Sequence, residues 1–218
     1  MRFQDAAPDA RAIVYAGIQA DPLVDRMAGL LETASTAQLV LARAVMNGER
    51  TDPDTWRTMV PACFPDARSE AILEASLQVA GRGEQVRSQF RGAIVEALTE
   101  RLLRHRAASA GAVRRERRVL FDGVRAEIHP YDVTVEAAGG AEAYDCKWGA
   151  RGINADVLHQ LDDARQHAAD EEESLLVGLV VFDTRLACIV RLEGMTAPHQ
   201  ATRLITIETL AGLARARP

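Results

Sequence analysis

The sequence predicts a mixed α/β protein, in which helices cover a central mixed sheet and a small all-helical region precedes it. Three observations support this fold class. Of the 218 residues 48% are apolar but only 5% are aromatic, a composition that favours closely packed helices over a modest sheet. Apolar residues recur at helical spacing in the first half of the chain and alternate or run continuously in the second. The length suits one large domain, or a compact domain with a smaller partner.

Residues 1–82 are expected to form a helical region for dimerisation or contact with a partner protein. Their apolar positions lie three or four apart, and each segment opens at a helix-start signal. The predicted helices begin at Asp21-Pro22, at Ser35 or Thr36, at Asp52-Pro53 and at Asp66. Nothing in this region has a chemical signature, so we assign it to packing and protein contact.

Residues 83–218 are predicted to form a second domain that opens with one long helix. This helix covers residues 84–105, where apolar side chains recur at every fourth position. Small residues at 107–112 follow it and are typical of a linker. After this linker the spacing of apolar residues changes to that of strands.

Three strands are predicted to follow the linker. Strands 115–121 and 124–135 flank a turn at Asp122-Gly123. A third strand over 143–148 follows a turn at Gly139-Gly140. Such short turns indicate that neighbouring strands pair side by side.

The last part of the chain is predicted to add a helix and two or three strands. Asn154 can cap a helix that ends near residue 170. Nearly continuous apolar runs at 175–182 and 187–192 are typical of strands buried by helices, and 203–207 suits an edge strand. The complete order is helix, three strands, helix and two or three strands, which indicates a mixed sheet covered by helices.

Several classes of protein are excluded by the sequence. No apolar run approaches the roughly 20 residues that span a bilayer, and the N-terminus lacks the pattern of a secretory signal. Three cysteines in no paired spacing make a disulfide framework improbable. The motifs of P-loop NTPases, serine hydrolases and zinc proteins are absent. We therefore expect a cytoplasmic protein with no membrane contact.

The basic residues are 25 arginines and a single lysine, Lys147. This bias indicates an arginine-rich coding habit in which surface lysines have been replaced. An ammonium is a compact point charge, whereas a guanidinium is a broad planar fork. Lys147 is therefore expected where a guanidinium cannot act, the alternative being a lysine that survived by chance on the surface.

Asp145 and Lys147 lie two positions apart in a predicted strand and therefore project to the same face. The preceding strand brings Asp132 beside them, because a glycine turn lies between the two strands. Two adjacent carboxylates repel each other unless a cation lies between them, and oxygen ligands suit Mg²⁺ or Mn²⁺. A lysine beside such an ion could orient or deprotonate a water and could balance phosphate charge.

These residues resemble the signature of the PD-(D/E)XK nuclease superfamily, whose restriction-endonuclease-like fold has an αβββαβ core. The predicted element order is similar to that core over residues 84–210. Asp132 matches the aspartate on the second strand of the signature, and Asp145-Cys146-Lys147 matches the (D/E)XK on its third. Pro130 lies two residues before Asp132, whereas the signature has proline directly before aspartate.

The resemblance implies metal-dependent hydrolysis of a phosphodiester bond. Asp132 and Asp145 would hold Mg²⁺ or Mn²⁺ together with the backbone carbonyl of Cys146. Lys147 would position the attacking water.

The resemblance also nominates two residues on helices. Many members carry a glutamate on the helix before the strands, and Glu96 in the segment RGAIVE looks like that residue. Glu96 would bind the water network or a second ion, the alternative being an exposed helix residue paired with an arginine. In some members a glutamine on the later helix reaches the substrate, which matches Gln160.

Charge is distributed unevenly along the chain. Residues 82–125 contain eleven arginines and five acidic residues, although the whole chain has a net charge of −5. A basic stretch in an acidic protein suits a localised contact with a polyanion, the alternative being a solvated arginine face. The arginines that we expect to bind DNA are Arg114, Arg115, Arg117 and Arg118.

Together these features predict a Mg²⁺-dependent DNA endonuclease of a bacterial defence, restriction or mobile-element system. Cutting both strands needs two active sites, so we expect a homodimer. One alternative is a nuclease-fold module that binds nucleic acid or a partner protein without cutting. A weaker alternative makes Lys147 a Schiff-base lysine, which no phosphate-binding glycine loop supports.

Overall fold

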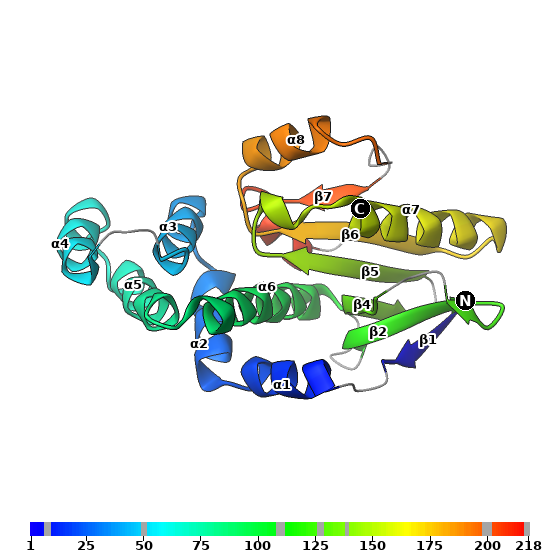
Figure 1. Cartoon of the computed structure of the whole chain (residues 1–218), viewed down its shortest axis with the longest axis horizontal. Coiled ribbons are helices and arrows are strands. Elements are labelled where there is room, and N and C mark those ends of the chain that lie inside the picture. The colour runs from blue at the N-terminus through cyan, green and yellow to red at the C-terminus, as the bar shows by residue number, and fades with distance from the viewer. Residues whose placement is uncertain are drawn as a thin grey trace. The chain divides into compact units, whose positions relative to one another are not determined.

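The chain forms two compact units (Figure 1). This computed structural model describes residues 1–6, 10–48, 52–107, 112–125, 129–137, 140–197 and 202–215. The sheet unit comprises Met1–Pro8 and Leu102–Pro218, and the helical unit comprises Asp9–Arg101. The division therefore lies beyond the predicted boundary at residue 82, and the first residues of the chain belong with the sheet.

The helical unit consists of five helices and most of a sixth, within the described residues. These are α1 (Ala10–Gln19), α2 (Pro22–Glu32), α3 (Thr36–Met46), α4 (Pro53–Cys63), α5 (Ala67–Ala80) and α6 (Glu84–Arg106). At each predicted start a capping side chain accepts hydrogen bonds from N–H groups of the first turn, namely Asp21, Ser35, Asp52 and Asp66. The four predicted helices and the long one after them are confirmed, whereas α1 was not predicted.

The sheet unit contains a mixed sheet with seven strands in the described part of the chain. They are β1 (Arg2–Asp5), β2 (Val113–Phe121), β3 (Val124–Arg125), β4 (Tyr131–Ala137), β5 (Gly140–Lys147), β6 (Leu175–Val181) and β7 (Arg203–Ile205). Their order is β1-β2-β4-β5-β6-β7, and β3 pairs with β2. The strand pairs from β1 to β5 are antiparallel, whereas β5, β6 and β7 are parallel neighbours. The predicted mixed α/β class is confirmed.

The predicted turn at Asp122-Gly123 joins β2 to β3. Both residues have positive φ, 47° for Asp122 and 81° for Gly123, which matches the twist of an antiparallel hairpin. Gly139 lies outside the described residues. Gly140 begins β5 at a φ of 146°, and a Cβ there would lie 2.8 Å from the hydroxyl of Ser174. Glycine at this turn thus avoids a steric clash.

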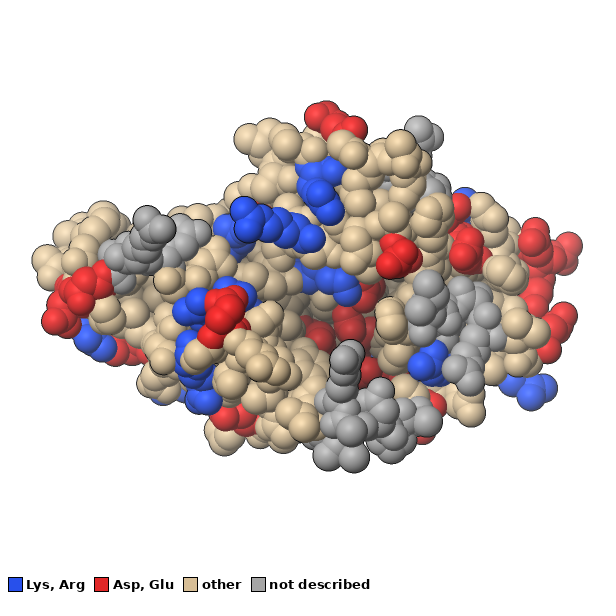
Figure 2. Space-filling model, in the orientation of Figure 1, with Lys and Arg blue, Asp and Glu red and all other residues tan. Residues whose placement is uncertain are grey.

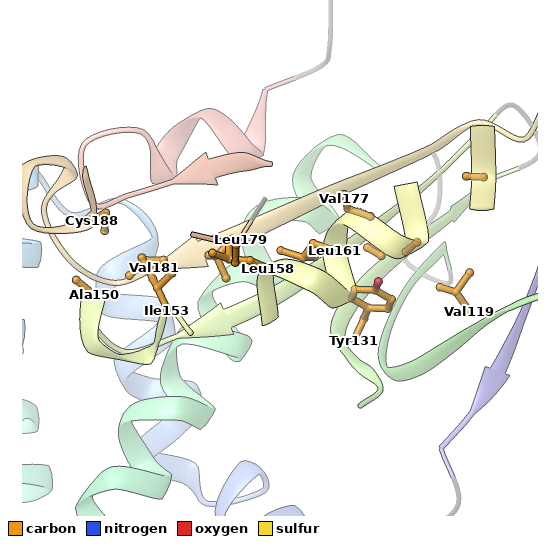
Figure 3. Packing of buried hydrophobic residues seen from close by; sticks show 14 of the residues in the cluster. Val119, Tyr131, Ala150, Ile153, Leu158, Leu161, Val177, Leu179, Val181 and Cys188 are labelled. Atoms are coloured by element: carbon orange, nitrogen blue, oxygen red, sulfur yellow. The ribbon is translucent and has the colours of Figure 1, made fainter. Parts of the chain in front are cut away.

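Helix α7 (Ala155–Asp170) covers one side of the sheet (Figure 3). The Asn154 side chain accepts a hydrogen bond from the first turn, as predicted. Leu158 and Leu161 pack against strand residues such as Leu179, and all three are fully buried. Burying each such side chain stabilises the fold by about 1.5–3 kcal/mol. This packing fixes α7 over the strands that carry the predicted site.

The predicted strand at 187–192 is wrong, because this segment lies in helix α8 (Arg185–Glu193). Thr184 caps α8 by accepting a hydrogen bond from the N–H of Ala187. Leu186 and Val190 are exposed, so the apolar run is not a buried strand. A short apolar run does not distinguish the two structures by its spacing.

Among the described residues, two short 3₁₀ helices are η2 (Ala150–Gly152) after β5 and η3 (Leu210–Ala214) near the C-terminus. Strand β1 was not predicted, because its four residues pair with a strand more than a hundred positions away. In the ranges that the structure describes, every helix is too short or too polar to cross a bilayer.

Candidate functional site

Strands β4 and β5 bring the three signature residues together. The antiparallel register pairs Val133 with Tyr144, so its next step places Asp132 opposite Asp145. Lys147 lies two residues further along β5 and shares the face of Asp145. The predicted grouping of Asp132, Asp145 and Lys147 therefore follows from the pairing of two neighbouring strands.

Lys147 forms an ion pair with Asp145 in the interior of this site. Its Nζ lies 2.9 Å from Oδ1 and 2.7 Å from Oδ2 of the carboxylate. Asp145 is only 6% exposed, and its Oδ2 makes no hydrogen bond of good geometry with any described residue. Asp132 is half-buried, and its Oδ2 accepts a hydrogen bond from the N–H of Cys146 at 2.5 Å. The site thus holds a buried oxygen whose main contact is a lysine.

The charge state of Lys147 follows from these neighbours. Burial alone would lower the pKa of its ammonium group. The charges of Asp145 and Asp132 act in the opposite direction and prevail, so the pKa lies above its ordinary value. Lys147 is consequently a cation at neutral pH, which can donate hydrogen bonds but cannot accept a proton.

The segment after β5 holds Lys147 in place. A Cβ added to Gly152 would lie 3.0 Å from the Cβ of Lys147, so any other residue here would crowd this stem. The Lys147 carbonyl accepts a hydrogen bond from the N–H of Phe182 at 2.8 Å. Asp183, which is 5% exposed, accepts a hydrogen bond from the N–H of Ala150 at 3.0 Å. These contacts fix the backbone on both sides of the lysine.

Sequence reasoning missed Gly152 and Asp183. The signal for Asp183 was present, because it directly follows the apolar run of a buried parallel strand, where polar residues often serve a site. Gly152 had no such signal, since its role depends on how closely η2 approaches β5. Only the three-dimensional structure shows that approach.

Gln160 on α7 is 6% exposed and contacts the chain just before β4. Its side-chain oxygen accepts a hydrogen bond from the N–H of His129 at 3.2 Å, and its nitrogen donates to the carbonyl of the same residue at 3.1 Å. Tyr131 also donates its hydroxyl hydrogen to the carbonyl of Gln160. Gln160 thus holds the start of the strand that carries Asp132, and its predicted contact with substrate stays a prediction.

Glu96 belongs to the helical unit, where it is 5% exposed. Its carboxylate accepts hydrogen bonds from the hydroxyl of Tyr15 at 2.6 Å and from the amide of Gln19 at 2.8 Å. A Cβ at Gly92, one turn earlier, would lie 3.0 Å from that hydroxyl. Glu96 is thus a buried acceptor rather than an exposed helix residue, and its role in catalysis stays a prediction.

The four β2 arginines differ in their surroundings. Arg117 donates to the Glu136 carboxylate at 2.7 and 3.2 Å and also pairs with an aspartate of β1. Arg115 and Arg118 are half-buried, and Arg114 is exposed. The guanidinium of Arg117 is already paired inside the protein. Arg114 is the most accessible of the four, because it is the exposed one.

The donors available for a metal ion are two carboxylates and backbone carbonyls. Over the described ranges, no group of three or more His, Cys, Asp or Glu side chains is placed to hold an ion. Of the carboxylates predicted to hold a metal ion, Asp132 and Asp145 lie on the adjacent strands β4 and β5. The N–H of Cys146 points toward Asp132, and its carbonyl lies on the same side of the strand.

Comparisons with known proteins give one structural likeness. No family model and no curated protein matches the chain. The crystal structure of protein VC1899 from Vibrio cholerae is similar, at 17% identity and a TM-score of 0.49. The match covers 98% of this chain but 56% of that protein, so the chain spans little more than half its length. A likeness this distant carries no argument about function, which therefore rests on the site itself.

Proposed function

We propose that the sheet unit is a metal-dependent nuclease that hydrolyses phosphodiester bonds of DNA. The observation that carries this proposal is the placement of the only lysine against Asp145, next to Asp132 on the adjacent strand. An arginine-rich chain that keeps one lysine, half-buried and paired with a buried aspartate, indicates a site that needs a compact cation donor.

The order of elements supports a PD-(D/E)XK arrangement. Helix α6 precedes the antiparallel strands β2, β4 and β5, and α7 then leads to the parallel strand β6. This sequence of elements matches the αβββαβ core if the two-residue β3 is counted as part of the hairpin. Asp132 then lies on the second core strand and Asp145 with Lys147 on the third.

The residues present fit a Mg²⁺ or Mn²⁺ ion. Magnesium in phosphate-processing sites is commonly held by one or two carboxylates plus substrate oxygens and water, so a third carboxylate is not required. The buried Oδ2 of Asp145, which makes no well-formed hydrogen bond with the described residues, is the oxygen best suited to it. Asp132 and the carbonyl of Cys146 would complete the protein ligands.

Each residue then has a distinct task. When bound, the ion polarises the phosphate and lowers the pKa of water beside it. Asp132 and Asp145 bind it, and the hydrogen bond from Cys146 orients the Asp132 carboxylate. Lys147, as an ammonium donor, orients the attacking water or neutralises charge that develops on the phosphate. Glu96 lies in the helical unit, and its part in catalysis stays a prediction.

A second candidate function is a nuclease-fold module that binds nucleic acid or a partner protein without cutting. The ion pair between Lys147 and Asp145 favours it, because the lysine already neutralises one carboxylate without any metal. We rank it second, since neutralisation alone gives no reason for a lysine in place of the arginine used everywhere else.

The experiment that separates these functions is a cleavage assay on supercoiled plasmid and single-stranded DNA with Mg²⁺, Mn²⁺ or EDTA. Cleavage that needs the metal and falls by about a hundredfold or more in Asp145→Asn supports the nuclease. Asp163→Asn, an exposed carboxylate on α7, is the matched control and should cut normally.

Three results would contradict the nuclease. One is cutting that persists in EDTA, and another is an Asp145→Asn variant as active as the wild type. The third is a wild type that binds DNA without cutting it, which favours the module. We further propose that double-strand cutting uses a homodimer, in which case linear product appears with a second-order dependence on protein.

A further inference from the structure

Two arginines of the sheet unit, which the sequence did not single out, lie on or bond to the segment that packs against Lys147. Arg151 is the middle residue of η2, and Arg191 lies near the end of α8. Both side chains are exposed. Figure 2 shows basic side chains on the surface directly below α8. The question is therefore what these two cations contact.

Arg151 makes no ion pair or hydrogen bond with any described residue. It directly precedes Gly152, and a Cβ added to Gly152 would lie 3.0 Å from the Cβ of Lys147. The Asp183 carboxylate accepts a hydrogen bond from the N–H of Ala150, so the backbone that carries Arg151 is fixed. Arg151 is therefore an exposed guanidinium on the segment that packs against the stem of Lys147, and it is suited to a ligand that also reaches Lys147.

Arg191 is oriented by a single contact. Its Nε donates to the carbonyl of Ile153 at 3.0 Å, which ties α8 to the segment that follows η2. This bond leaves the two terminal nitrogens without a partner in the described structure. The carbonyl lies two residues after Arg151, so the two arginines belong to neighbouring segments, η2 and α8, of the sheet unit.

We propose that Arg151 and Arg191 form a phosphate-binding pair that holds the DNA backbone next to Lys147. This inference rests on the proposed function, because it places the contact beside the bond to be cut. Guanidinium groups bind phosphate oxygens through paired N–H donors, and phosphate contacts position DNA without reading its sequence. The pair thus sets where the backbone lies relative to Asp145 and Lys147.

This pair is better suited to the task than Arg117 on β2. The guanidinium of Arg117 is already paired with Glu136, and breaking that pair would leave a carboxylate unmatched. Arg151, by contrast, gives up no ion pair or hydrogen bond with a described residue when it binds phosphate. We therefore place the contact with the DNA backbone beside the cut bond at η2 and α8 rather than at Arg117.

The test measures binding of a fluorescein-labelled DNA duplex by anisotropy over a series of salt concentrations. All proteins carry Lys147→Ala, so the DNA stays intact in the presence of Mg²⁺. Arg151→Gln and Arg191→Gln should each weaken binding roughly fivefold near ~0.15 M salt and reduce the slope of log K against log salt by about 1. Arg2→Gln is the control, because Arg2 is exposed on β1, three strands away from β5.

Arg191→Lys guards against an effect of folding. The lysine lacks the Nε that bonds to Ile153, so any effect of losing that bond on folding remains in this variant. Because the lysine keeps the positive charge, the variant should retain the salt slope of the parent protein. The inference is overturned if Arg151→Gln and Arg191→Gln bind with the parent slope, or if Arg2→Gln weakens binding equally. If the substitutions weaken binding but the wild type never cuts, the phosphate site stands and the nuclease fails. A parent that binds no DNA overturns both.

Discussion

Lys147 combines three properties that distinguish it from an ordinary surface lysine. It is the only lysine of the chain, its ammonium contacts both oxygens of Asp145, and its stem packs against Gly152. The first property is visible in the sequence, and the others need the structure. Together they favour a role that depends on the shape of the side chain as well as on its charge.

Lys147→Arg tests this role of shape. A broad planar guanidinium cannot place a single compact donor where Nζ contacts Asp145, so DNA cleavage should fall by about a hundredfold or more although the charge is kept. Single-turnover cleavage at saturating protein measures this loss. An arginine variant that cuts like the wild type would show that charge alone suffices.

Gly152→Ala tests the packing beneath Lys147. The added methyl would lie 3.0 Å from the Cβ of Lys147, and relieving such a contact costs about 1–3 kcal/mol. Cleavage should fall, while the affinity for DNA changes little. Gly212→Ala is the matched control, because its added Cβ meets no atom within 4 Å. Equal cleavage by both variants would remove Gly152 from the support of Lys147.

At the scale of elements, the Gln160 side chain of α7 bonds to the backbone of His129, just before β4. The amide of Gln160 makes both backbone hydrogen bonds of His129, as a neighbouring strand would. The chain therefore enters β4 in a fixed conformation, three residues before Asp132. A helix side chain thus takes the place of a strand at the edge of the site.

Gln160→Leu should show what this contact contributes. Leucine keeps most of the volume but leaves the N–H and carbonyl of His129 without their partners, which costs about 1–3 kcal/mol. Urea unfolding of wild type and variant measures the difference. His159→Ala, at an exposed neighbouring position, should leave stability unchanged. A Gln160 variant as stable as the wild type would contradict the proposed support of β4.

The sequence predicted most elements because their signals are local. Asp21, Ser35 and Asn154 cap helices at the predicted starts. The Asp122-Gly123 turn forms with the positive φ angles that its residues favour. Helix α8 was mistaken for a strand because a short apolar run fits either period. Strand β1 pairs only across a long sequence separation, which no local pattern reveals.

The same division applies to the candidate site. Alternation along a strand was enough to group Asp145 with Lys147, and a glycine turn was enough to bring Asp132 to them. The contacts that Gln160 and Asp183 make could not be predicted, because they join segments that are distant in sequence, although the place of Asp183 at the end of a buried strand was a signal for the residue itself. The sequence therefore predicted the grouping of the candidate site residues but not the contacts that hold them in place.

At the scale of the whole molecule, a buried polar network ties the end of α6 to the sheet. Arg106 donates to the Glu142 carboxylate, with Nη1 2.7 Å from Oε1, and Tyr144 also donates to Glu142. The Nε of Arg106 bonds to the carbonyl of Leu213 at 2.8 Å. This network lies on the strand that carries Asp145, on its opposite face, since Glu142 and Tyr144 alternate with it.

The network makes a prediction about alkaline pH. Burial, followed by the hydrogen bond to Glu142 and its charge, raises the pKa of Tyr144 from 10.0 to about 12. Between these values the folded protein keeps a proton that the unfolded chain loses, so stability falls as pH rises through this range. The loss attributable to Tyr144 is about 2–3 kcal/mol.

Urea unfolding at about pH 9 and about pH 11 captures roughly half of this loss, about 1.4 kcal/mol, because pH 11 lies about one unit above the ordinary pKa of tyrosine; Tyr144→Phe is the comparison. The phenylalanine variant lacks the titrating group, so its stability should decrease less over the same interval. Equal decreases in the two proteins would show that Tyr144 ionises as it does in the unfolded chain.

The measurement that tests the account most directly is the rate of supercoiled plasmid cleavage in Mg²⁺ by the wild type and by Lys147→Ala. We expect the wild type to nick or linearise the plasmid and the variant to be slower by about a hundredfold or more, with unchanged circular dichroism. A folded Lys147→Ala variant that cuts at the wild-type rate would contradict the assignment of this site.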